Sequence, residues 1–393
     1  MPPARIALVG NLANVAYRTC KFLRREGVQA DVYVDNSELV FPTSNPENED
    51  AWILENPPAW LKITPKPSLP VGMWKRQPLR IALWGSRRIG RKIAKHVLIR
   101  TLRKYDLIVS YCCAPWFVQE IGCPYVSVAT GSDLRELALE DSPRGRHARS
   151  IFEHAQLVIH GPDPASLEAA NLLKLRSSYV HFPVDTEFFV PSDTLRPRNP
   201  TDELVVFHPS NLDWTYTGPD RWTKGNDRLF RALARLVNED SKARLVYLER
   251  GPDIEATREL VKNLGIESHV EAISRTMPRA ELRDYYGMAD VVADQFSRTS
   301  FGQIGLEAMS CGKPVLVDVD LRTMNLFYEE FPPVLNCRTE DEIYTQLKVV
   351  LDFDFRQKLG QHAREWIMNY HGSETATTEL VKRLEDVLGR SLF

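Results

Sequence analysis

Residues 294–317 read DQFSRTSFGQIGLEAMSCGKPVLV, and this stretch decides the fold. It predicts the end of a strand, a polar loop, a helix that begins near Gly302 and, after Gly-Lys-Pro, another strand. Gly302 and Gly305 would let a ligand approach the backbone, and the N–H groups of the first helical turn favour an anion such as a diphosphate. Glu307, one turn into the helix, could accept hydrogen bonds from a diol such as a ribose. An ordinary β–α–β unit with glycines at tight turns would show the same pattern.

The same alternation of strand-like and helix-like runs extends through most of the chain, which predicts an α/β protein with parallel sheets. It breaks between residues 36 and 77, a stretch rich in Pro and Trp that we expect to be a long loop or insertion. Strands are expected over residues 5–10, 30–34, 79–84, 107–112, 125–128, 204–208, 243–248, 270–273, 291–294 and 315–319. Helices are expected over residues 14–26, 227–237, 254–264, 279–287 and 303–310.

The length of 393 residues favours two domains. Residues 191–203 are polar and punctuated by Pro, so we place the linker there. This gives a Rossmann-like domain over residues 1–190 and a second over residues 204–370, with 371–393 as a C-terminal helix that crosses back to the N-terminal domain. Ligands of such sheets bind at the carboxyl ends of the strands, so we expect the site in a cleft between two facing domains.

The composition is that of a soluble globular protein, with 43% hydrophobic and 26% charged residues. No run reaches the ~20 apolar residues of a transmembrane helix, and the N-terminus does not resemble a signal peptide. The six cysteines show no CxxC pair and no metal-ligand spacing, which favours free thiols in a reducing cytosol. The expected location is therefore cytoplasmic.

The net charge of −2 conceals a strong segregation of charge. Residues 75–104 hold 11 Lys or Arg and no Asp or Glu, leaving 39 of the 50 basic residues against 52 acidic residues elsewhere. Such segregation points to a partner of opposite charge. Nucleic acid is not expected, because Trp74 and Trp84 show no stacking pattern.

Residues 86–104 predict an amphipathic helix in this basic segment. We expect its apolar stripe to pack inward and its cationic face, Arg87–Lys104, to dock on an anionic membrane, which would make the protein peripheral at the inner membrane face. The expected stripe consists of Ile89, Ile93, Val97, Leu98 and Leu102.

Two further loops follow predicted strands. Arg221 and Lys224 lie in a polar loop after the strand ending at His208, where a cation could neutralise a leaving phosphate, although a solvated loop would look similar. Residues 10–18 lead into a helix but lack GxGxxG, and residues 85–92 lack the Gly-Lys-Ser/Thr of a P-loop, which excludes ATP binding by that route.

Five ordered segments resemble glycosyltransferase family 4, whose members are retaining enzymes of the GT-B fold. SFGQIGLEAMSCGKPVLV resembles the family signature, and Lys224-Gly225 resembles its Lys-Gly pair. The other three are TGSDLRELA from Thr130, YVHFPVDTEFFVP ending at Pro191 and ISRTMPRAELRDYYGMADVV from Ile273. The resemblance covers nearly the whole chain. It implies two Rossmann-like, doubly wound domains facing across a cleft, the first of which binds the acceptor and the second the nucleotide sugar.

The resemblance also implies roles for individual residues. Lys224, helped by Arg221, would hold the diphosphate, and Asp133 would line the acceptor side. Ten residues form the expected site: Lys224, Arg221 and Asp133 in catalysis, and Glu307, Gly302, Gln303, Thr299, Asn14, Arg275 and Met277 in donor binding. Glu307 would bind the ribose, Gly302 and Gln303 the phosphates or sugar, Arg275 to Met277 the base, and Asn14 the phosphates from the other domain.

The implied reaction is the retaining, metal-independent transfer of a hexose from a UDP- or GDP-linked sugar to a lipid-linked, polysaccharide or small-molecule acceptor, with no cofactor. Asp318-Val319-Asp320 resembles a metal-binding DxD, but we interpret it as the end of a buried strand. The family's first glutamate is Thr299 here, and its histidine is Thr130. These departures leave two alternatives, a catalytically silent nucleotide-sugar-binding scaffold, and a GT-B relative such as an inverting transferase or a sugar-nucleotide epimerase.

Overall fold

The computed structural model describes residues 2–35, 44–51, 53–64, 92–112, 116–192, 203–216, 223–239, 241–297 and 300–393. The chain divides into two compact units. The first consists of Met1–Gly161, Ala165–Val180 and Thr377–Phe393, and the second of Pro162–Pro164 and His181–Ala376. The strand expected over residues 79–84, most of the expected linker, Arg221 and Thr299 lie outside the described residues.

The first unit is built on a parallel sheet with the strand order β3-β2-β1-β4-β5-β6-β7. The order reverses between β1 and β4, as in a doubly wound fold. Its strands are β1 (Arg5–Val9), β2 (Gln29–Asp35), β3 (Leu61–Thr64), β4 (Leu107–Tyr111), β5 (Tyr125–Val128), β6 (Leu157–His160) and β7 (Ser177–Tyr179). Its helices include α1 (Val15–Arg25), α3 (Val118–Ile121), α4 (Ser132–Arg135), α5 (Pro143–Glu153) and α6 (Pro164–Leu172).

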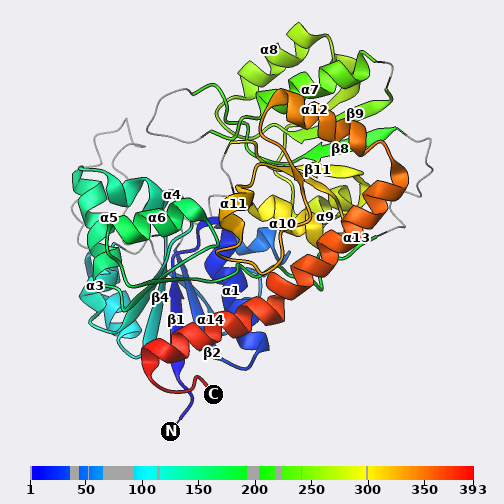
Figure 1. Ribbon diagram of the computed structural model, residues 1–393. Coiled ribbons are helices and arrows are strands. Elements are labelled where there is room, and N and C mark those ends of the chain that lie inside the picture. The colour runs from blue at the N-terminus through cyan, green and yellow to red at the C-terminus, as the bar shows by residue number, and fades with distance from the viewer. Residues whose placement is uncertain are drawn as a thin grey trace. The chain divides into compact units, whose positions relative to one another are not determined.

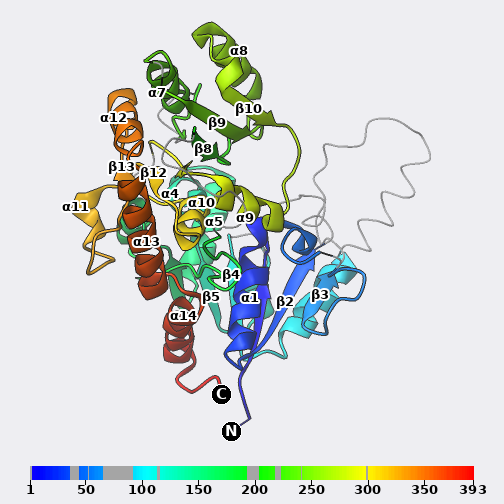
Figure 2. The same cartoon turned by 90° about the vertical axis from the view of Figure 1, so that its right-hand side faces the viewer.

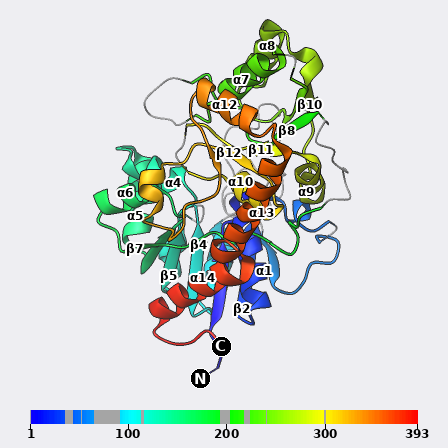
Figure 3. The same ribbon diagram turned by 45° about the vertical axis from the view of Figure 1, so that its right-hand side comes forward.

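The helices of the first unit cover both faces of its sheet (Figure 1). On one face, Ala7, Ile108 and Val158 of the strands share a core with helix residues such as Leu102 and Phe152. On the other face α1 packs against β1 and β2. Figure 3 shows α1 and α14 (Ser373–Leu388) in front of these strands.

The second unit repeats the plan with the parallel strand order β10-β9-β8-β11-β12-β13, which reverses between β8 and β11. Figure 2 shows α7 and α8 on one side of its sheet and α9 and α10 on the other. Its strands are β8 (Leu204–His208), β9 (Ala243–Leu248), β10 (Val270–Ile273), β11 (Val291–Ala293), β12 (Val315–Val317) and β13 (Leu335–Asn336). Its helices are α7 (Asp227–Val237), α8 (Ile254–Leu264), α9 (Arg279–Met288), α10 (Gln303–Ser310), α11 (Leu321–Met324), α12 (Glu340–Val349) and α13 (Phe353–Tyr370).

The boundary between the units lies at Val180/His181, before the expected linker. Residues 181–190 belong to the second unit because their backbone is bonded there. The carbonyl oxygen of Phe189 accepts hydrogen bonds from the Ser310 hydroxyl at 2.7 Å and from Arg364 at 2.8 Å. The chain rejoins the first unit at Thr377 within α14, and Arg390 forms an ion pair of 2.7 Å with Asp106 there.

The helix over residues 92–102 differs from the expected amphipathic helix in one respect. Leu98 and Leu102 are buried as expected, but Ile93 and Val97 are 59% and 58% exposed. At roughly 100° per residue, Ile93 and Val97 lie on the side opposite to Leu98 and Leu102, so the five residues cannot form one stripe. Ile89 and Arg87 lie outside the described residues. None of the helices described is long and apolar enough to cross a membrane.

Candidate functional site

The carboxyl ends of β8 and β11 bring three polar side chains together at the point where the second sheet reverses its strand order. The Lys224 ammonium donates a hydrogen bond to Ser210 Oγ at 3.2 Å, and the Ser210 hydroxyl donates to Asp294 Oδ1 at 3.3 Å. Ser210 and Asp294 are both fully buried. Ligands of doubly wound sheets bind at such a reversal, so this cluster is the first candidate for the donor site.

Asp294 also caps the N-terminus of α10. Its Oδ2 accepts the N–H of Gly302 at 2.6 Å, and the N–H of Gly305 is bonded to the same carboxylate. Burial raises the pKa of Asp294, while Lys224 and these hydrogen bonds oppose the rise. The hydrogen-bond donors and the Lys224 ammonium therefore offset the energetic cost of burying this carboxylate.

The two glycines of the signature make room for that carboxylate. A Cβ atom at Gly302 would lie 2.6 Å from Asp294 Oδ1, and one at Gly305 would lie 2.9 Å from Oδ2. Within the second unit these glycines thus admit a side chain of the protein, and the expected approach of a ligand to their backbone stays a prediction. Gln303 begins α10, and its contact with a phosphate stays a prediction.

The backbone of Lys224 is held between two loops that follow neighbouring strands. Its N–H donates to the carbonyl oxygen of Asp213 at 2.6 Å, and its own carbonyl oxygen accepts the N–H of Phe296 at 2.8 Å. Gly225 follows with φ +65°, which suits glycine, and α7 begins at Asp227. The Lys-Gly pair therefore positions the ammonium group through backbone contacts on both sides.

His208, at the end of β8, supports this arrangement as a neutral side chain. Burial, together with the charge of Lys224, lowers the pKa of His208 to about 4. His208 Nδ1 lies 2.8 Å from the carbonyl oxygen of Ala293, so Nδ1 carries the proton. Nε2 then accepts a hydrogen bond from Asn226 at 2.7 Å, whose Oδ1 accepts the N–H of Asp213 at 2.9 Å. Sequence reasoning missed this network.

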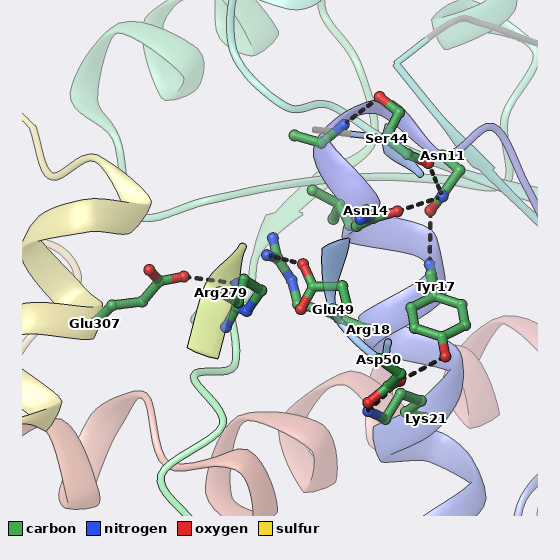
Figure 4. Close-up of polar contacts among 12 residues, drawn as sticks. Asn11, Asn14, Tyr17, Arg18, Lys21, Ser44, Glu49, Asp50, Arg279 and Glu307 are labelled. Atoms are coloured by element: carbon green, nitrogen blue, oxygen red, sulfur yellow. Dashed lines mark hydrogen bonds and ion pairs between the residues drawn. The ribbon is translucent and has the colours of Figure 1, made fainter. Parts of the chain in front are cut away.

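Glu307, the expected ribose ligand, is held by two buried partners. Arg279 forms an ion pair of 2.9 Å with Oε1, and the Tyr286 hydroxyl donates to Oε2 at 3.2 Å. The Arg279 guanidinium also lies over the ring of Phe189, 4.6 Å from its centroid. Figure 4 shows the Arg279–Glu307 contact. Each carboxylate oxygen has two lone pairs, so both can accept one more hydrogen bond from a diol.

The loop expected to flank a base precedes α9. Arg275 is exposed and pairs with Glu281, whereas Met277 is buried. Arg250, which follows β9, was missed by sequence reasoning. It is exposed, donates to the carbonyl oxygen of Pro209 at 3.1 Å and interacts electrostatically with Glu307. Its position after a strand end was a signal that could have identified it.

In the first unit, Asn14 lies in the loop between β1 and α1, with a left-handed φ of 56° that asparagine tolerates. It is fully buried, accepts a hydrogen bond from Asn11 at 2.8 Å and donates to the carbonyl oxygen of Asn45 at 2.7 Å. Asn11 in turn accepts the N–H of Tyr17 at 2.9 Å and donates to the carbonyl oxygen of Ser44 at 2.9 Å. Asn14 therefore shapes this loop, and its contact with phosphate stays a prediction.

Ion pairs fasten residues 44–50 to α1 (Figure 4). Lys21 lies 2.7 Å from Asp50, which also accepts a hydrogen bond from the Tyr17 hydroxyl at 2.6 Å. Arg18 pairs with Glu49 at 3.1 Å, with both side chains largely buried. These contacts hold residues 44–50 against α1.

Asp133 lies in α4, just beyond the carboxyl end of β5. Its Oδ1 accepts the N–H groups of Thr130, Gly131 and Leu134 at 3.0–3.1 Å. Burial raises the pKa of Asp133 to about 6, against the opposing effect of these amides. Among the residues that the structure describes, its buried Oδ2 has no hydrogen-bond partner. This oxygen can accept a hydrogen bond from a hydroxyl group of a ligand.

The two aspartates of Asp318-Val319-Asp320 have separate structural partners. Asp318, buried just after β12, pairs with Arg338 at 3.2 Å. Asp320 caps α11 by accepting the N–H of Arg322 at 3.1 Å.

Comparisons with known proteins identify the family. The model of the family described as "Glycosyl transferases group 1" matches residues 213–322, which include Lys224, Asp294 and Glu307. The D-inositol 3-phosphate glycosyltransferase of Saccharomonospora viridis is 30% identical over 311 residues, covering 69% of this chain and 68% of the relative. A protein of the same name from Kribbella flavida is 30% identical over 172 residues, covering 42% of this chain and 37% of the relative. The latter match thus spans less than two thirds of the relative's length.

Two solved structures share the fold over nearly the whole chain. Anabaena HepE, crystallised with UDP and glucose, has a TM-score of 0.65 at 17% identity and covers 97% of this chain and 99% of its own. The sucrose-phosphate synthase of Thermosynechococcus elongatus has a TM-score of 0.66 at 15% identity and covers 98% of this chain and 99% of its own. The expected GT-B fold and the resemblance to family 4 are thereby confirmed. The chain belongs to the group 1 glycosyltransferases.

Proposed function

We propose that the protein is a retaining glycosyltransferase that moves a hexose from a UDP- or GDP-linked sugar to an acceptor hydroxyl. The observation that carries this proposal is the cluster at the reversal point of the second sheet, where Lys224 meets Ser210 and Asp294. Glu307 follows on α10, whose N-terminus Asp294 caps. A cation for a diphosphate and a carboxylate for a ribose are thus supplied by one unit.

The role of Lys224 is to stabilise charge on the departing diphosphate. As the bond between the anomeric carbon and the phosphate oxygen breaks, negative charge grows on that oxygen, and an ammonium already fixed by backbone contacts stabilises it without reorganising. The acceptor oxygen bonds to the same face of the anomeric carbon, and its proton passes to the departing phosphate oxygen. Arg221 is the proposed second cation. With these cations the reaction needs neither a metal ion nor a cofactor.

Asp133 is the proposed contact for the acceptor. Its Oδ1 is held by three backbone amides, while Oδ2 can accept a hydrogen bond from an acceptor hydroxyl. Fixing that hydroxyl lowers the entropic cost of reaching the transition state. The names of the relatives suggest a phosphorylated cyclitol as one small-molecule acceptor, and lipid-linked and polysaccharide acceptors fit the same role.

We place the reaction in the cytoplasm, with the protein peripheral on the inner membrane face. Six cysteines without a disulfide pattern suit a reducing compartment. The basic segment over residues 75–104 supports contact with an anionic surface.

The test is a panel of nucleotide sugars with the wild-type protein and two lysine variants. Lys224→Ala should lower kcat/KM for donor hydrolysis or transfer by about 10²–10³-fold. Lys262→Ala, on the exposed side of α8, is the matched control and should keep wild-type kinetics. Wild-type turnover by Lys224→Ala would refute the assignment. Saturable donor binding without turnover in the wild type would instead support a scaffold.

A further inference from the structure

The helix over residues 92–102 presents an outward face that the proposed reaction does not use. Ile93 and Val97, one turn apart, are 59% and 58% exposed. Lys92, His96 and Arg100 are exposed beside them, and Lys104 follows just beyond the helix. We call these six residues the Ile93 face. Its centre is aliphatic and its surroundings are basic.

The rest of the helix is held to the first unit. Leu98, Ile99 and Leu102 are buried in the core. Lys95 forms an ion pair of 2.6 Å with Glu120, and Arg103 donates to the carbonyl oxygen of Ile121 at 2.8 Å. These contacts anchor the side of the helix opposite to the Ile93 face, so that face is presented by a fixed scaffold.

We propose that the Ile93 face docks on an anionic lipid bilayer, an inference that rests on the membrane location proposed above and names the residues that make the contact. Ile93 and Val97 insert at the level of the headgroups, and Lys92, Arg100 and Lys104 lie against lipid phosphates. The Ile93 face holds Lys92, Arg100 and Lys104 and no acidic residue, so its charge is complementary to anionic lipid. Two aliphatic side chains surrounded by cations suit the bilayer surface, where the acyl region is apolar and the headgroup region is charged. A nucleic acid would use the cations and leave the exposed aliphatic centre without a partner, which favours the bilayer.

The experiment is co-sedimentation of the full chain with vesicles of phosphatidylcholine, with and without an equal amount of phosphatidylglycerol. We expect binding to the anionic vesicles at low salt, weaker binding at high salt, and none to pure phosphatidylcholine. Ile93→Ser with Val97→Ser should lower the partition coefficient at least about tenfold. Leu172→Ser is the matched control, because Leu172 is 65% exposed on α6 of the same unit, and it should bind as the wild type does.

A charge variant, Arg100→Gln with Lys104→Gln, should bind anionic vesicles more weakly and with less salt dependence. All of these residues are exposed, so the variants should keep the wild-type melting temperature and donor hydrolysis in the absence of vesicles. Wild-type binding by the Ile93/Val97 variant would overturn the proposal, as would binding of the wild type to duplex DNA but not to vesicles. Neither result would bear on the donor chemistry, which is measured separately.

Discussion

The buried pair of Arg279 and Glu307 allows a sharp prediction. Their side chains are 8% and 4% exposed and lie 2.9 Å apart, and the Tyr286 hydroxyl is the second donor to Glu307. Arg279→Met keeps the length of the side chain but leaves the carboxylate with one neutral donor. Removing one partner of a buried ion pair costs about 3–5 kcal/mol, so we expect that loss in the free energy of opening of the second unit.

Native-state hydrogen exchange of the α9 and α10 amides measures this free energy for the second unit alone. Glu307→Gln combined with Arg279→Met removes both charges, so the double variant should be less destabilised than the two single variants added together. Arg275→Met is the matched control. Arg275 is exposed in the loop before α9, where it pairs with Glu281 of that helix, so its loss should have little effect on this free energy. A loss below about 1 kcal/mol for Arg279→Met would refute the reasoning.

Three further predictions concern buried groups. Gly302→Ala should destabilise the protein by about 1–3 kcal/mol, because its Cβ would lie 2.6 Å from Asp294, and thermal melts should show a smaller cost in an Asp294→Ala background. Burial lowers the pKa of His208 to about 4, so the folded protein favours the neutral side chain. This contributes about 3 kcal/mol to the free energy of unfolding, and the contribution is lost as the pH falls from about 6.5 to 4. Urea titrations of His208→Gln should not show this loss. Burial raises the pKa of Asp133 to about 6, so its protonated form stabilises the folded protein at low pH. The free energy of unfolding of the wild type, relative to that of Asp133→Asn, should therefore fall by about 3 kcal/mol as the pH rises from about 4 to 6. A difference between the two proteins that does not change with pH would contradict this.

Much of the second unit could be predicted from local sequence, because its strands are apolar runs and its helices begin and end at recognisable residues. The helix predicted over residues 303–310 after Gly302 is α10, and that predicted over residues 254–264 before Gly265 is α8. The start of α10 and the end of α8 are both set by local backbone conformation, which at Gly265 is left-handed. Sequence patterns predict such helix ends well.

Short strands in the first unit were missed because pairing with a neighbour, and not a local signal, defines them. β3 lies within the stretch of residues 36–77 that we interpreted as a loop or insertion, and it is a strand because it pairs with β2. β7, three residues long, is likewise an edge strand. Most residues of these two strands are only half-buried, so their hydrophobic signal is weak.

The sequence predicted residues of the candidate site, whose roles stay predictions, but it did not predict the contacts among them. Lys224 and Glu307 were found from motifs, yet Arg279, 28 residues before Glu307, and the carboxylate of Asp294 behind Gly302 depend on tertiary packing. The spacing of residues in the sequence does not predict which buried side chain neutralises the charge of another or occupies the space beside a glycine. Helical geometry alone could have predicted that Ile93 and Val97 lie opposite to Leu98 and Leu102. The expected stripe was wrong because it combined residues from both of these faces.

The most direct test of the central claim is a crystal structure of the protein with UDP. The account predicts the diphosphate within hydrogen-bond distance of Lys224 Nζ and the ribose hydroxyls on the carboxylate of Glu307. A UDP molecule bound elsewhere, with Lys224 and Glu307 keeping only their partners within the protein, would contradict it.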